Sequence, residues 1–354
     1  MTIVASFEIE CLRFVGPDGK PVADLPAFAR DRGIVTGLYR WMVLTRAFDT
    51  KAIALHRTGR LGTYASSAGQ EAVAVGVADA MAPDDVLLPS FREHGAQLVR
   101  GVTMKELFLY WGGDGRGSDF AGPRQDFPVC VPVGSHAPHA AGAALAFKLR
   151  GEARAAVAIF GDGATSKGDV YEAMNIAGSW ALPVVFVVSN NQWAISVPRA
   201  AQTAAETLAQ KAIAAGFEGL QVDGNDVVAV RQATADALGK ARVGGGPTLI
   251  EALTYRLGDH TTVDDASRYR DDEEVGRHWK EEPIVRSRSF LIETHGWTRE
   301  EEEALIGECG AAVGAAADDY LTVAPEDPGA VFDWLYEELP TAYARQRTDM
   351  LAGE

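Results

Sequence analysis

The sequence lacks the marks of secreted and membrane proteins. It has three cysteines, Cys11, Cys130 and Cys309, whose spacing fits neither a disulfide framework nor a zinc site, so we expect free thiols in a reducing compartment. The opening MTIVASFEIE has no basic stretch and carries two glutamates, unlike a signal peptide. No apolar run approaches the roughly 18 residues of a membrane span. These absences predict a cytoplasmic protein.

Basic residues are also in short supply. Lys and Arg number 33 against 49 Asp and Glu, a formal net charge of −16. An acidic surface repels nucleic acids and anionic membranes, so we expect neither as a partner. The chain is 47% hydrophobic and 23% charged over 354 residues, which is an ordinary globular balance with ample length for a large core.

Two short apolar runs, Ala155–Phe160 and Pro183–Val188, organise the middle of the chain. Both are continuous and rich in Val, Ile and Phe, as strands buried on both faces of a parallel sheet are. A helical pattern lies between them, so the stretch predicts one βαβ unit. The first run ends in Gly161-Asp162-Gly163 and the second in Asn190-Asn191.

This spacing predicts a metal-bridged diphosphate site. Asp162 and Asn191 should meet at the carboxyl edge of the sheet, where ligands bind. A carboxylate and an amide oxygen suit Mg²⁺, which completes its shell with water and phosphates. Gly161 and Gly163 leave room for a backbone to approach a ligand. The next helix, expected to begin near residues 164–166, would offer free N–H groups to the diphosphate.

The rest of the chain fits an α/β fold with a doubly wound, mostly parallel sheet flanked by helices. We expect an N-terminal arm at residues 1–30 and the α/β domain at 31–275. A helical C-terminal segment, 276–354, should pack on the same body. The small residues of the helix opened by Gln70 and Glu71 predict close packing against another subunit, and the pattern of 199–218 predicts one Ala-rich helix.

Further candidate ligands follow two other expected strands. Arg92 follows Asp85–Pro89, and its guanidinium could hold a phosphate through two N–H groups. His260 lies in a polar loop after Thr248–Thr254, on the same sheet edge. A long loop at 112–135, rich in Gly and Pro, is also a functional candidate.

The chain resembles the alpha subunit of the thiamine-diphosphate-dependent E1 component of 2-oxo acid dehydrogenase complexes. The stretches that carry the resemblance are RTGRLGTYASSAGQEA, LLPSFREHG, GDGATSKGDVYEAMN, NNQWAIS and YRLGDHTTVDDASRYR. The resemblance implies the diphosphate-binding half of a thiamin diphosphate-binding fold. The cofactor contacts that it implies are Phe91, Arg92, Val131, Val133, Gly161, Asp162, Gly163, Ala164, Asn191, Trp193 and His260.

The resemblance also implies roles. Asp162 and Asn191 would bind Mg²⁺ through their side chains and Trp193 through its carbonyl. His260 would be the catalytic residue that assists acyl transfer to lipoamide. Phe91 stands where the family has Tyr, which removes a hydroxyl contact.

Two other positions, His136 and Thr261, depart from the family's pattern. His136 replaces a frequent Gln, so a nearby monovalent-cation site is not assumed. Thr261 and Ser267 occupy the loop positions of serines that are phosphorylated in some members, so control by a kinase is not assumed either.

The implied reaction is decarboxylation of a 2-oxo acid and reductive acylation of E2 lipoyl domains. A beta subunit would supply the carboxylate that activates the cofactor, in an α2β2 heterotetramer. Overall similarity favours pyruvate, with branched-chain 2-oxo acids such as 3-methyl-2-oxobutanoate, or acetoin, as alternatives.

Two rival functions are weaker. A nicotinamide dehydrogenase would need a third glycine where Ser166 stands. A non-catalytic interaction subunit would have no need of Asp162, Asn191 and His260.

Overall fold

A six-stranded sheet forms the centre of the computed structural model, which describes residues 1–333 and 335–353. Its order is β1-β7-β8-β4-β3-β2, and each neighbouring pair runs parallel. The strands are β1 (Cys11–Leu12), β2 (Val86–Leu88), β3 (Ala156–Gly161), β4 (Val184–Asn190), β7 (Glu218–Asp223) and β8 (Thr248–Leu253). A short hairpin, β5 (Trp193–Ala194) and β6 (Val197–Pro198), follows β4. The α/β sheet expected from the apolar runs is confirmed.

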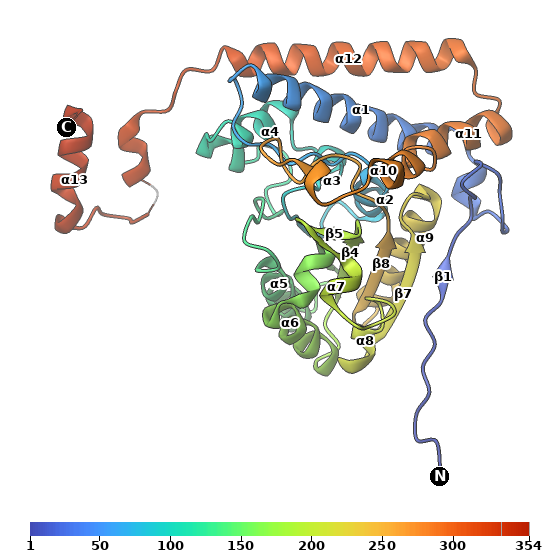
Figure 1. Ribbon diagram of the computed structural model, residues 1–354. Helices are drawn as coiled ribbons and strands as arrows, with labels where there is room; N and C mark the ends of the chain where they lie inside the picture. Colours follow the sequence, from blue (N-terminus) through green and yellow to red (C-terminus); the bar gives the residue numbers. More distant parts are fainter. Residues whose placement is uncertain (334, 354) are drawn as a thin grey trace.

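Helices cover both faces of the sheet (Figure 1). Along β4, Val184, Phe186 and Val188 pack in the core under α5 and α6, whereas Val185 and Val187 face the opposite core under α2 and α9. Alternate side chains of one strand therefore enter two cores, which is why the run is apolar throughout. The helices are α2 (Glu71–Ala80), α5 (His136–Arg150), α6 (Gly168–Ser179) and α9 (Val227–Arg242).

A further helical layer lies above the sheet in Figure 1, built on α1 (Arg32–Arg57) and α12 (Arg299–Leu321), which lie side by side. Both start at sequence-encoded caps. Asp31 accepts the N–H groups of Gly33 and Ile34, and Thr298 forms a capping box with Glu301. Four more helices are α3 (His94–Arg100), α4 (Met104–Trp111), α10 (Asp272–His278) and α11 (Pro283–His295).

The prediction of a single helix over 199–218 is wrong. The chain forms α7 (Arg199–Gln202) and α8 (Lys211–Ala214), and β7 begins at residue 218. The reason is tertiary: the buried Glu251 carboxylate accepts the backbone N–H groups of Leu208 and Ala209 at 2.7 and 3.0 Å. A charged acceptor from a distant strand thus outweighs the helix preference of a few alanines.

The helix after Asp162 also begins later than expected. A 3-10 turn, η3 (Asp162–Ser166), comes first, and α6 starts at Gly168. The N–H groups nearest to Asp162 therefore belong to η3 and not to the first turn of an α-helix.

Helix α2 packs within its own chain, contrary to the expected contact with another subunit. Its small residues lie against α9, and a Cβ added to Gly76 would meet Val230 Cγ1 at 2.9 Å. Glu71 to Ala78 are all buried. The small side chains of α2 therefore allow a close approach to α9 of the same chain, and not to another subunit.

The two ends of the chain behave differently. Residues of the N-terminal arm add β1 to the sheet edge, and Asp226 accepts the N–H groups of Phe14 and Val15 at 2.7 and 2.8 Å. At the other end, α11 and α12 pack on α1. In contrast, α13 (Thr341–Ala352) lies away from the sheet and is exposed or half-buried throughout, so the packing expected for 276–354 does not extend to it (Figure 1).

The cysteines Cys11, Cys130 and Cys309 are free, as expected. In the described part of the chain, no helix combines the length and apolarity needed to cross a membrane.

Candidate active site

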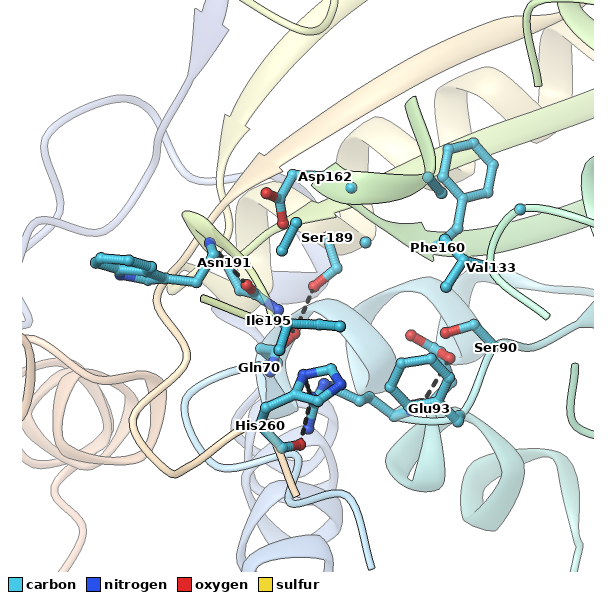
Figure 2. Close-up of a pocket in the computed structure, with 18 residues that line it drawn as sticks. Gln70, Ser90, Glu93, Val133, Phe160, Asp162, Ser189, Asn191, Ile195 and His260 are labelled. Atoms are coloured by element: carbon cyan, nitrogen blue, oxygen red, sulfur yellow. Dashed lines mark hydrogen bonds between the residues drawn. The ribbon is translucent and has the colours of Figure 1, made fainter. Parts of the chain in front are cut away.

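A cavity opens where β3 and β4 end at the carboxyl edge of the sheet (Figure 2). Its lining consists of Gln70, Ser90, Phe91, Arg92, Glu93, Val133, Gly134, Phe160, Gly161, Asp162, Gly163, Ala164, Ser189, Asn191, Trp193, Ala194, Ile195 and His260. This set includes every residue singled out from the sequence as a cofactor contact except Val131. That side chain is 55% exposed and lies outside the lining.

Asp162 follows β3 directly and is 1% exposed. Its Oδ2 accepts a 2.6 Å hydrogen bond from Gln202 Nε2. Burial raises the pKa of the Asp162 carboxyl, an effect that the Gln202 bond opposes. A carboxylate buried with an amide as its hydrogen-bond donor is a strong ligand for a cation, because a cation would relieve the cost of burial.

The two asparagines at the end of β4 point in different directions. Asn190 donates to Glu251 Oε1 at 2.7 Å, away from the cavity. Asn191 lines the cavity and accepts the Trp193 N–H on its Oδ1 at 3.2 Å. Only Asn191 can therefore act together with Asp162.

The backbone beyond Asn191 turns sharply. Gln192 and Ile195 have φ of 73° and 56°, in the left-handed region that costs a side-chain-bearing residue about 1 kcal/mol or more. Buried Arg256 stabilises this turn, since its guanidinium donates to the carbonyls of Trp193 and Ile195 at 3.2 and 2.9 Å. The Trp193 carbonyl is thereby fixed beside the cavity.

The two glycines that flank Asp162 are needed for different structural reasons. A Cβ on Gly163 would lie 2.8 Å from Ala194 Cβ, so no other residue lets β5 lie over η3. A Cβ on Gly161 would meet nothing within 4 Å. Gly163 is required by the close approach of two backbones, whereas Gly161 only keeps the cavity wall open.

The donor set suits a magnesium ion shared with a phosphate ligand. Asp162 and Asn191 offer hard side-chain oxygens and Trp193 a carbonyl. Across residues 1–333 and 335–353, no cluster of three or more His, Cys, Asp or Glu side chains could hold a metal alone. Mg²⁺ is usually bound by only one or two protein carboxylates, and water and substrate phosphates complete its octahedron. Asp162, Asn191 and the Trp193 carbonyl therefore fit Mg²⁺.

His260 and Arg92 form the opposite wall. Arg92 Nη2 donates to His260 Nδ1 at 2.8 Å and to its carbonyl at 2.6 Å, and Nη1 donates to Ser66 O at 2.6 Å. Phe91 meets the His260 ring edge-on at 6.0 Å between centroids. The arginine expected to bind phosphate thus also positions the histidine.

These contacts settle the protonation of His260. A guanidinium only donates, so Nδ1 must accept, and the proton of the neutral ring resides on Nε2. Burial, followed by the charges of Arg92 and Arg256, lowers the pKa of His260 to about 4. At neutral pH the side chain is an uncharged hydrogen-bond donor through Nε2.

Sequence reasoning missed several lining residues, among them Gln70, Ser90, Glu93 and Ser189. Ser189 could have been predicted from the sequence, because it lies two residues before Asn191 and so points to the same face of the strand. Glu93 was not: it is 4% exposed and accepts the Arg92 N–H, and burial raises its pKa to about 7. Only the packing around it shows that this carboxyl enters the cavity.

Comparison with known proteins gives consistent matches. Residues 39–325 match the family described as "Dehydrogenase E1 component". The 3-methyl-2-oxobutanoate dehydrogenase subunit alpha of Mycobacterium tuberculosis (strain CDC 1551 / Oshkosh) is 41% identical over 352 residues, 99% of this chain and 96% of that protein. The pyruvate dehydrogenase E1 component subunit alpha of Staphylococcus aureus (strain Mu50 / ATCC 700699) is 39% identical over 341 residues, covering 96% and 92%.

Proposed function

The chain belongs to the dehydrogenase E1 component family, and we propose that it is the alpha subunit that holds the diphosphate end of thiamine diphosphate during decarboxylation of a 2-oxo acid and acylation of lipoyl groups on an E2 acyltransferase. One observation carries the proposal. Asp162, Asn191, Trp193 and His260 come from three segments, which follow β3, β4 and β8, and they line one cavity at a sheet edge.

The metal role falls to three oxygens. The Asp162 and Asn191 side chains and the Trp193 carbonyl would bind Mg²⁺, with diphosphate oxygens among its other ligands. Gly163 and Ala164 would present backbone N–H groups to the diphosphate, since no side chain intervenes at Gly163. Arg92 would add positive charge at the same end.

When bound, thiamine diphosphate supplies the nucleophilic carbon and the electron sink for the decarboxylation. The protein supplies orientation and electrostatics. His260, held neutral by burial and by Arg92, would donate a hydrogen bond from Nε2 to the acceptor oxygen or sulfur of the reacting groups. The apolar walls, Phe160, Val133 and Ile195, would exclude water around them.

A second chain would close the cavity. Five apolar side chains that line the cavity or lie within three residues of its lining along the chain are exposed: Val131 (55%), Val133 (46%), Ile195 (56%), Val197 (44%) and Val263 (70%). Val133 and Ile195 also line the cavity, so the partner would share the site itself. A beta subunit in an α2β2 heterotetramer fits this surface and would supply the carboxylate that activates the cofactor.

Pyruvate is the proposed substrate, and 3-methyl-2-oxobutanoate is the second candidate. The two relatives named for these substrates are 39% and 41% identical to this chain, so similarity does not separate the candidates. Much of the substrate pocket would come from the beta subunit.

The test is a titration of the purified chain, with and without a beta subunit, which we expect a neighbouring reading frame to encode. We expect thiamine diphosphate to bind the complex in the presence of Mg²⁺, as measured by calorimetry. A panel of pyruvate, branched-chain 2-oxo acids and acetoin then identifies the substrate by CO₂ release and lipoyl acylation. Absence of cofactor binding in both preparations would make the chain a non-catalytic interaction subunit.

A further inference from the structure

Two glutamines, neither of them an expected cofactor contact, form hydrogen bonds to the two side chains assigned to the metal. Gln70 bonds Asn191, and Gln202 bonds Asp162. Gln70, at the start of α2, accepts hydrogen bonds on its Oε1 from Asn191 Nδ2 at 3.0 Å and Ser189 Oγ at 3.1 Å. Gln202, the last residue of α7, donates from Nε2 to Asp162 Oδ2 at 2.6 Å. Figure 2 shows the first pair of bonds between Gln70 and the end of β4.

The orientation of the Gln70 amide follows from the backbone. The Trp193 N–H can only donate, and it bonds the Asn191 side chain at 3.2 Å, so that atom of Asn191 is Oδ1. The NH₂ group of Asn191 therefore faces Gln70, and Gln70 must present its oxygen. Gln70 is 4% exposed, and its Nε2 has no hydrogen-bond partner. The side chain is thus used as an acceptor, and its donor half is left unsatisfied.

The orientation of Gln202 follows from the opposite logic. An ionised carboxylate only accepts, so the amide nitrogen of Gln202 faces Asp162. The bond occupies Oδ2 of Asp162. Gln202 comes from α7, one of the two short helices that replace the expected long one. Because the helix ends at Gln202, this side chain can reach the Asp162 carboxylate.

We propose that Gln70 and Gln202 are positioning residues for the metal: Gln70 aims Asn191 Oδ1, and Gln202 fixes the Asp162 carboxylate so that its second oxygen is free for Mg²⁺. The inference rests on the metal–diphosphate site of the proposed function. Mg²⁺ tolerates little departure from octahedral geometry, so residues that orient its ligands affect affinity strongly. One positioning residue acts as an acceptor and the other as a donor.

The experiment measures the Mg²⁺ concentration needed for thiamine diphosphate to bind the complex with the beta subunit, by calorimetry. Gln70→Leu and Gln202→Leu should each raise this concentration by about tenfold or more, a typical effect of losing a residue that orients a metal ligand. Saturating Mg²⁺ should restore cofactor binding, because the metal ligands themselves remain. General damage to the fold would not be restored in this way.

Two matched variants sharpen the test. Gln70→Glu keeps an oxygen acceptor facing Asn191 and Ser189, so its Mg²⁺ requirement should stay within about threefold of the unmodified complex. Gln232→Leu removes a glutamine that also donates to a carboxylate, Asp236, on the solvent-facing side of α9, and should change nothing. Should Gln70→Leu fail to fold, Gln70→Glu and Gln202→Leu, a change at a half-buried residue, still decide the matter.

The outcomes are distinct. A shifted Mg²⁺ requirement in the leucine variants, with Gln70→Glu unaffected, supports the inference. Leucine variants with an unchanged requirement, or a Gln70→Glu variant as impaired as Gln70→Leu, would overturn it while leaving the proposed function intact. An unmodified complex that binds no cofactor at any Mg²⁺ concentration would overturn the proposed function and the inference with it.

Discussion

His260 should stay uncharged across the range in which most histidines titrate. Its pKa is about 4, because burial and the charges of Arg92 and Arg256 disfavour the imidazolium. At about pH 6.5 an ordinary histidine is half protonated, whereas His260 would be protonated in about 0.3% of molecules. Reactions that depend on it should therefore show no acidic limb near pH 6.5 that belongs to this residue.

The measurement is NMR titration of the chain labelled with ¹³C-histidine, with His260→Gln to identify the signal. Two variants test the cause. Arg92→Met removes a nearby cation and should move the titration midpoint upward. Asp264→Asn removes the anion that favours the imidazolium, and should move it downward. A midpoint near 6.5 in the unmodified chain, or shifts of the opposite sign, would refute the reasoning.

The depressed pKa also has a consequence for stability. The unfolded chain would take up a proton at His260 near pH 6.5, but the folded chain only near pH 4. The folded state is therefore favoured above this window and loses that contribution as the pH falls through it. Thermal melts between about pH 4 and 7 should show a smaller loss for His260→Gln than for the unmodified chain.

Other predictions concern the metal site and the packing. Asp162→Asn should weaken Mg²⁺-dependent cofactor binding by about a hundredfold or more without lowering the melting temperature, as calorimetry and melts would show; unchanged affinity would contradict the metal assignment. Gly163→Ala should impair cofactor binding, because its Cβ would lie 2.8 Å from a β5 side chain, whereas Gly168→Ala meets nothing within 4 Å and should be neutral. Gly76→Ala should lower the free energy of unfolding by about 1–3 kcal/mol, because its Cβ would overpack against α9. Gly239→Ala, at an exposed position of α9, should instead raise the free energy of unfolding by up to about 1 kcal/mol. Urea unfolding measures both, and equal effects would argue against the close contact of α2 and α9.

The candidate site was largely accessible from the sequence because its parts are local. An apolar run that ends in a glycine-flanked aspartate, and a second run that ends in Asn190-Asn191, place Asp162 and an asparagine at one sheet edge by strand geometry alone. The choice between Asn190 and Asn191 was different. It depends on which strand face meets Glu251, a residue 61 positions further on, and that is a tertiary fact.

Local chemistry also fixed the caps of the outer helices. Asp31 and Thr298 satisfy N–H groups within three residues, so no distant contact was needed to foresee where α1 and α12 begin. The segment 199–218 shows the reverse. Its alanines favour a helix, yet the buried Glu251 carboxylate takes its backbone N–H groups, and α7 ends at Gln202.

The sequence by itself therefore determined the βαβ unit, the residues available to a metal and a diphosphate, and the family to which the chain belongs. Only the tertiary structure decided how these residues are held. Arg92 reaches His260 across 168 positions and bonds its Nδ1, and Gln70 reaches Asn191 across 121. Such contacts leave no periodic signal, because the packing of separate loops at one sheet edge creates them.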